Sequence, residues 1–171
     1  MDIQCGVIMA MYPKFYVGKG INEYISQLGD LMYQSEEMCK KAVYPAAGLV
    51  ADRIRFNIDS IETRAPHGDD GVFEDQRRGL QKGLGISQFQ NRFGYINVKL
   101  GFDGYNQHVT DTYPTGQPNA MIARAINSGT SFSKKYPFVD WAVRDTREDA
   151  EKLMKENIDG YIYNIMKNEK A

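Results

Sequence analysis

The chain has little of the residue types that build metal centres and covalent frameworks. Its 171 residues include two cysteines and two histidines. The cysteines, Cys5 and Cys39, stand too far apart to form a disulfide framework or a structural zinc site. A small secreted domain held together by disulfides is therefore excluded, and assembly inside a cell is the simpler context.

Strong net charge and long apolar runs are also missing. The formal net charge is −1, so no overall positive field favours sequence-specific binding to nucleic acid. The basic pairs Arg77-Arg78 and Lys134-Lys135 are typical of solvated surface charge. No apolar run approaches the roughly 20 residues that cross a bilayer. A signal peptide has basic residues before its apolar region. Here Asp2 stands before the short apolar run 6–11, so we expect no signal peptide.

What is present is an ordinary globular composition. Hydrophobic residues make up 42% of the chain and charged residues 25%. A chain of this length buries about two thirds of its unfolded surface around one core. We therefore predict a single domain over residues 1–171, in which residues 1–20 form an N-terminal extension.

Two helical patterns follow that extension. Apolar residues recur at three-four spacing from Ile21 to Val43 and again from Ala47 to Ile61, with polar residues between them. Pro45 stands between the two runs, where proline kinks or ends a helix. The spacing predicts one long N-terminal helix that is kinked near Pro45.

The middle of the chain predicts loops and strands. Residues 62–90 are polar and glycine-rich, which predicts a long loop or insertion with a short helix around Glu74–Lys82. Residues 95–102 alternate between apolar and polar side chains, the period of a half-buried strand. Residues 106–118 are rich in Thr, Asp, Pro and Gly and predict a long connection.

The C-terminal third predicts a strand and a helix. Residues 120–126 are ambiguous by themselves, because Ala and Met favour a helix whereas the short length and glycine boundary suit a strand. We expect a strand, partly because of the family resemblance described below. Thr146 and Asp149 resemble a capping box and predict the start of a closing helix with an apolar face. The expected fold class is α+β, with a long kinked N-terminal helix and a C-terminal helix packed on a small antiparallel β-sheet, joined by long loops.

Few residues suggest catalysis. His67, Asp69 and Asp70 could share a divalent ion, and His108 and Asp111 would complete the site if two loops met. A solvated Pro-His-Gly-Asp-Asp-Gly turn explains the same residues without a metal. No nucleophile elbow or phosphate-binding glycine loop is present. We therefore expect no enzyme, no cofactor and no metal.

Aromatic side chains are plentiful, with eleven tyrosines and eight phenylalanines. Several lie in segments without a regular pattern, including Tyr105 and Tyr113. Aromatic residues contribute large contact areas at protein interfaces. They also fasten long loops to a domain, and the sequence leaves both interpretations open.

One segment resembles a known family. It reads Asn127-Ser128-Gly129-Thr130-Ser131, then Lys134-Lys135, then Tyr136-Pro137-Phe138-Val139-Asp140-Trp141. This order is similar to the C-terminal half of the tail-completion or neck proteins of long-tailed bacteriophages. There, an aliphatic strand leads into Glu/Asn-x-Gly-Thr-Ser, and Pro-Phe begins a long helix. The junction Ala65-Pro66 also matches the family, whereas the following residues 67–73 depart from it.

The resemblance implies a structural virion protein, assembled in the host cytoplasm, at the junction of head and tail. It implies a ring of identical subunits, a hexamer, around a channel through which DNA passes without sequence-specific binding. The neighbours would be neck or stopper proteins and the tail terminator or tail tube, with no membrane. Segments 62–90 and 105–118 would become ordered against neighbouring subunits. Structural or interface roles fall on Gly129, Thr130, Pro137, Phe138 and Trp141, of which Phe138 and Trp141 are expected to be buried.

Three alternatives stay open at the level of the sequence. A tail terminator that caps the tail tube or sheath shares the same expected layout. A metal-dependent hydrolase would use loop 67–71. A cytoplasmic adaptor or chaperone would act in assembly without entering the particle.

Overall fold

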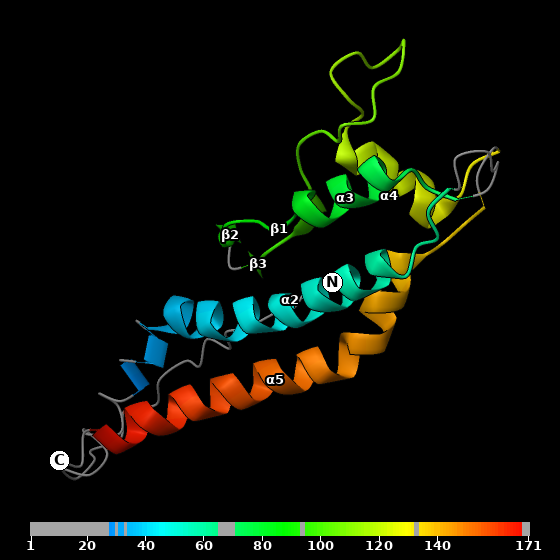
Figure 1. The fold of residues 1–171 in the computed structure, drawn as a ribbon. Coiled ribbons are helices and arrows are strands. Elements are labelled where there is room, and N and C mark those ends of the chain that lie inside the picture. Colours follow the sequence, from blue (N-terminus) through cyan, green and yellow to red (C-terminus); the bar gives the residue numbers. More distant parts are fainter. Residues whose placement is uncertain are drawn as a thin grey trace, which may run out of the picture. The chain divides into compact units, whose positions relative to one another are not determined.

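The computed structural model describes residues 28–29, 31–32, 34–64, 71–92, 95–131 and 134–168, and its ribbon is drawn in Figure 1. Helices and short antiparallel strands form an α+β fold, as the sequence predicts. The elements are α2 (Ser35–Asp59), α3 (Glu74–Gly83), β1 (Leu84–Ile86), β2 (Gln90–Arg92), β3 (Tyr95–Asn97), β4 (Leu100–Phe102), α4 (Asn119–Ser128) and α5 (Phe138–Asn168).

Chain contacts divide the molecule into two compact units. One comprises residues 46–88 and 99–150, and the other comprises residues 1–45, 89–98 and 151–171. We call them the core unit and the outer unit. The prediction of a single domain stays a prediction, and each unit is described by itself.

The strands form two separate pairs. In the core unit β1 pairs antiparallel with β4, with Gly85 opposite Gly101. In the outer unit β2 pairs antiparallel with β3, with Asn91 opposite Ile96. The prediction of one continuous strand over residues 95–102 is therefore wrong. The alternating pattern is real, but it is divided at residues 98–99, and its two halves pair with different partners.

The long N-terminal helix is present as α2, and Pro45 lies inside it. Its start at Ser35 lies well after the predicted Ile21, and residues 1–27 lie outside the described part. Glu36 and Glu37 each form an ion pair with the lysine four residues later, at 3.0 and 3.7 Å. This order of charges suits the helix dipole.

The core unit is built around one apolar cluster. Ile54, Ile58, Leu80 and Phe138 are its largest fully buried side chains. They come from α2, α3 and the first turn of α5, and α4 adds a buried face. Helices α3 and α4 are in contact and lie side by side in Figure 1.

The outer unit is held by contacts that include aromatic side chains. The Tyr44 hydroxyl accepts a hydrogen bond from the backbone N–H of Phe89 at 2.8 Å. Lys40 lies over the Phe89 ring and Lys41 over the Tyr161 ring, each 5.0 Å from the ring centroid. Such cation–π contacts contribute about 0.5–1 kcal/mol each at exposed sites.

The predicted strand over residues 120–126 is wrong, because this segment is helix α4. Its buried residues include Ile122, Ala123 and Ile126, whose spacing is that of a helix face. Pro118 precedes the helix and Gly129 follows it, which are typical flanking residues. The helix propensity of the alanines and Met121 thus outweighs the short length of the segment.

The predicted start of the closing helix at Thr146 is also wrong. Helix α5 already begins at Phe138 and continues through this position. The Thr146 hydroxyl donates a hydrogen bond to the Ala142 carbonyl at 2.7 Å, one turn back in the same helix. Inside a helix, a threonine hydroxyl can bond to the carbonyl one turn back instead of capping a helix start.

The segment 62–90 is only partly a loop. It contains α3 at the predicted position, β1, and an isolated bridge between Thr63 and Val72. The backbone N–H of Phe73 donates to the Gln76 side chain at 3.2 Å, which satisfies one donor at the start of α3. The predicted short helix around Glu74–Lys82 is confirmed, and β1 is an element that the sequence did not predict.

Candidate functional site

The segment that carries the family resemblance forms the junction between α4 and α5. The link is centred on Asn127, in the last turn of α4. Its side-chain oxygen accepts hydrogen bonds from the backbone N–H groups of Val139 at 3.0 Å and Asp140 at 3.4 Å. Its side-chain NH₂ donates to the Asp140 carboxylate at 3.1 Å. Asn127 therefore caps α5 from another helix, supplying an acceptor that helix starts require.

Gly129 makes the turn that ends α4. It has a φ of +77°, a conformation that side chains disfavour. A Cβ at this position would lie 3.0 Å from the Cβ of Lys135, so the returning chain also needs the space. Thr130 is exposed just beyond this turn. The predicted glycine turn is thus present, although a helix rather than a strand leads into it.

Pro137 and Phe138 fasten the start of α5 to the core unit. The Pro137 carbonyl accepts the backbone N–H of Trp141 at 2.9 Å. The Phe138 side chain is fully buried and meets the Phe102 ring edge-on, with ring centroids 5.9 Å apart. Asn57 of α2 donates a hydrogen bond to the Phe138 carbonyl at 2.8 Å.

Trp141 is half-buried, so the expectation that it is buried like Phe138 is corrected. Its ring packs edge-on against Tyr136, with centroids 4.9 Å apart. The Tyr136 hydroxyl in turn donates to the Ser60 carbonyl at the end of α2, at 3.4 Å. The two aromatic rings therefore cover the junction from outside, and Phe138 anchors it from inside.

The chemistry of this junction is packing and backbone capping. Among the capping contacts described above, Asp140 supplies an ionisable side chain, and this residue is exposed. The sequence predicts structural roles for Gly129, Pro137 and Phe138. It predicts no role for Asn127 or Asn57. An Asn at the last turn of one helix, with a Pro-Phe helix start about ten residues later, is the signal that could have identified the cap.

The segment 105–118 is a closed loop within the core unit. Tyr105 bridges to Pro118 at its base, and Thr110 bridges to Tyr113 at its tip. His108 stacks on the Phe73 ring with centroids 4.0 Å apart. The Tyr105 side chain is nevertheless 66% exposed, and that of Val109 is 61% exposed. The loop thus presents apolar side chains from a fixed backbone.

The proposed metal-binding residues are not brought together in the described part of the chain. His67, Asp69 and Asp70 lie outside the described residues. The His108 ring stacks on Phe73, and Asp111 is exposed. Within residues 34–64, 71–92, 95–131 and 134–168, no group of three or more His, Cys, Asp and Glu side chains is placed to hold a metal ion.

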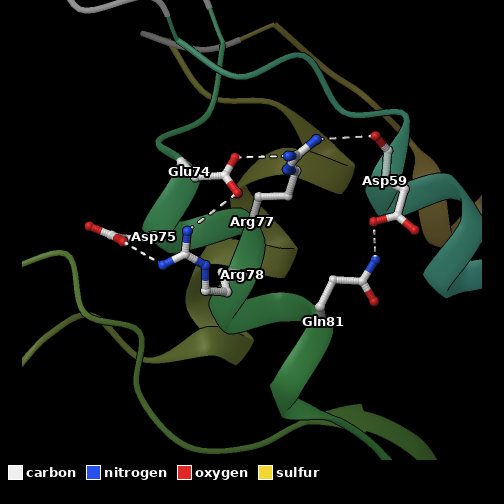
Figure 2. A network of polar contacts seen from close by, with 6 residues as sticks. All are labelled: Asp59, Glu74, Asp75, Arg77, Arg78 and Gln81. Carbon is white, nitrogen blue, oxygen red and sulfur yellow. Dashed lines mark hydrogen bonds and ion pairs between the residues drawn. The ribbon is translucent and has the colours of Figure 1, made fainter.

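Figure 2 shows the polar contacts of α3. Arg77 forms an ion pair with Glu74 at 2.8 Å and donates to the Asp59 carbonyl at the end of α2, at 3.2 Å. Gln81 donates to the Asp59 carboxylate at 2.6 Å. Arg78 reaches the carboxylates of Glu74 and Asp75 only at 3.7 Å each. The sequence predicts that Arg77 and Arg78 are both solvated surface charges. Only Arg78 stays at the surface, because Arg77 joins α3 to the end of α2.

Comparison with known proteins gives no relative for this chain: no protein-family model, curated protein or solved structure matches it. Among the described helices, none has an apolar stretch of the length required to span a membrane.

Proposed function

We propose that this chain is a structural protein of a long-tailed phage or prophage, a tail-completion or neck protein that forms a ring at the head-tail junction. The observation that carries the proposal is the α4–α5 junction. The residues that resemble the phage family, from Asn127 to Trp141, are those that cap α5 and anchor it to the core unit. Their role is to fix the direction of a long helix.

The surface of the chain supports an assembly role. Large apolar side chains are exposed in both units. They are Leu28, Met32, Tyr44, Phe56, Phe73, Tyr105, Val109, Met121, Val143 and Tyr163. Aromatic and methionine side chains are enriched at protein interfaces. A head-to-tail contact between identical subunits closes into a ring when its rotation permits, and such contacts need surfaces of this kind.

A near-neutral chain also suits a channel through which DNA must move. Many phosphate contacts would give strong binding, whereas a net charge of −1 gives no such general attraction. DNA would therefore pass the ring without being held in one register.

Removing the gene from the phage or prophage tests this function. We expect filled heads and tails that accumulate separately, and particles that are restored when the gene is supplied on a plasmid. Mass spectrometry of the restored particles is expected to detect the chain. Intact, infectious particles made without the gene would contradict the proposal.

A further inference from the structure

The core unit has an exposed Asp-Gly pair in the turn that follows β4. Asp103 and Gly104 are both exposed, so water reaches them. Gly104 has a φ of +73°, which glycine adopts without strain. In an Asp-Gly pair the glycine nitrogen can attack the carboxyl group that precedes it, because no glycine side chain hinders the approach. The geometry of the turn decides whether this pair can react.

The Gly104 nitrogen lies beside the Asp103 carboxyl group. Its N–H donates a hydrogen bond to Asp103 Oδ1 at 2.7 Å. The carbon that bears this oxygen, Cγ, is therefore close to the same nitrogen, and a bond between the two would close a five-membered ring. Holding two reacting groups in such an arrangement raises the rate of their reaction.

Neighbouring residues hold the turn in this arrangement. The Asp103 backbone N–H donates to the Gly83 carbonyl at 2.8 Å. Asn119, at the start of α4, is 3% exposed and contacts both residues of the pair. Its side-chain nitrogen donates to the Asp103 main-chain carbonyl at 2.7 Å, and its backbone N–H donates to the Gly104 carbonyl at 3.0 Å. The fold thus fixes the backbone on both sides of the reacting nitrogen.

We propose that Asp103 is a site of spontaneous isomerisation to isoaspartate, and that this change loosens the start of α4. The Gly104 nitrogen forms a bond to Cγ of Asp103, and the amide proton and a carboxyl OH leave as one water molecule. A second water molecule adds to the Asp103 main-chain carbonyl carbon of the cyclic imide and breaks its bond to the Gly104 nitrogen. The chain then runs through Cγ. One water leaves and one enters, so the reaction needs no oxidant or cofactor.

Asn119 directs the opening of the ring. The imide has two carbonyl groups, and water can add to either of them. The side-chain nitrogen of Asn119 donates to the oxygen of the Asp103 main-chain carbonyl, where negative charge develops when water adds. A donor placed at such an oxygen stabilises the transition state. Opening at this carbonyl gives isoaspartate, whereas opening at the other one restores aspartate.

A second Asp-Gly pair in the same chain provides an internal control. Asp159 and Gly160 lie within α5, and both are exposed. No atom lies within 4 Å of a Cβ added at Gly160, so space alone does not protect this pair. In a helix, however, the glycine N–H bonds to the carbonyl four residues back and is not directed at the preceding carboxyl group. The two pairs thus share sequence and exposure but differ in backbone geometry.

Ageing of the full-length chain in a mildly acidic buffer, folded and in denaturing urea, tests the site. Mass spectrometry with electron-transfer fragmentation distinguishes aspartate from isoaspartate in the tryptic peptides 100–124 and 156–167. We expect folding to leave the rate at Asp103 unchanged or to raise it. Folding should lower the rate at Asp159 at least about tenfold, because the helix must open locally before the pair can react. A rate at Asp103 that folding lowers as much as it lowers the rate at Asp159 would overturn the proposal.

Asp103→Glu is the matched variant, because it keeps the charge but would have to close a six-membered ring, which is much slower. In the aged original chain, we expect amide hydrogen exchange at Asn119 to become about tenfold faster in the isomerised fraction. The added main-chain carbon prevents Asn119 from keeping both of its contacts. The aged Asp103→Glu protein should keep slow exchange at Asn119. Equal acceleration in both proteins would overturn the proposed loosening of α4. The inference is independent of the proposed function.

Discussion

Asn127 shows how one side chain joins two helices. It lies in the last turn of α4 and caps α5, and its amide bonds to α5 through both its oxygen and its nitrogen. Because the first N–H groups of a helix have no partner in the helix itself, this contact decides where α5 begins.

Asn127→Ala is expected to lower the free energy of unfolding by about 1 kcal/mol, the typical cost of losing a helix cap. Chemical denaturation followed by circular dichroism measures the change. Asn164→Ala is the control, because Asn164 is exposed on the same helix. That control should change the value by less than about 0.5 kcal/mol. Equal effects of the two substitutions would show that Asn127 is not a cap.

Phe138 and Trp141 differ in burial, so their truncation should differ in cost. Phe138→Ala removes a fully buried ring and is expected to cost about 3–5 kcal/mol. Trp141→Ala removes a half-buried ring that touches Tyr136 and is expected to cost less. Denaturant titration of both variants measures the order. A larger loss from Trp141→Ala would contradict the placement of Phe138 as the inner anchor.

At the scale of elements, helix α3 depends on glycine where it meets other elements. A Cβ at Gly79 would lie 2.5 Å from the Cβ of Asn106, and one at Gly83 would lie 2.4 Å from the Asp103 carbonyl oxygen. Glycine normally weakens a helix, so its presence at two contact positions indicates that close approach outweighs helix propensity here.

Gly79→Ala is therefore expected to destabilise the protein by about 1–3 kcal/mol, as overpacking does. Gly48→Ala in α2 is the matched substitution, because no atom lies within 4 Å of the added Cβ. It should stabilise the protein by about 0.5–1 kcal/mol, through helix propensity alone. Thermal unfolding of the two variants checks the opposite signs. Stabilisation by both would mean that α3 does not pack as closely as described.

The sequence predicts an element well when the pattern that determines it lies within the segment itself. It predicts an element poorly when contacts with distant segments determine it. The apolar spacing of α2 and the polar helix α3 are local patterns, and both helices are present. The segment 120–126 has a short, ambiguous pattern, and its helical form depends on the buried face that includes Ile122 and Ile126. The division of residues 95–102 depends on pairing with β1 and β2, which no local alternation reveals.

The candidate site was predictable in part for the same reason. Gly129 and the Pro137-Phe138 start are local signals, and the structure places them at the turn and the helix start. The partners Asn57 and Phe102 come from distant segments, so only the fold brings them to Phe138.

At the scale of the whole molecule, each unit has its own stabilising contacts. The core unit has the buried apolar cluster and the α4–α5 junction. The outer unit has the β2–β3 pair and cation–π contacts. Helices α2 and α5 contribute residues to both units. In the ring that we propose, exposed apolar side chains from both units are available to neighbouring subunits.

The proposed ring can be looked for by cryo-electron microscopy of purified tailed particles whose genome encodes this chain. We expect a closed ring between head and tail whose subunit density fits the core unit, including the turn at Gly129 and the start of α5 at Phe138. A head-tail junction resolved to side chains in which every ring is built from other proteins would contradict the proposed function.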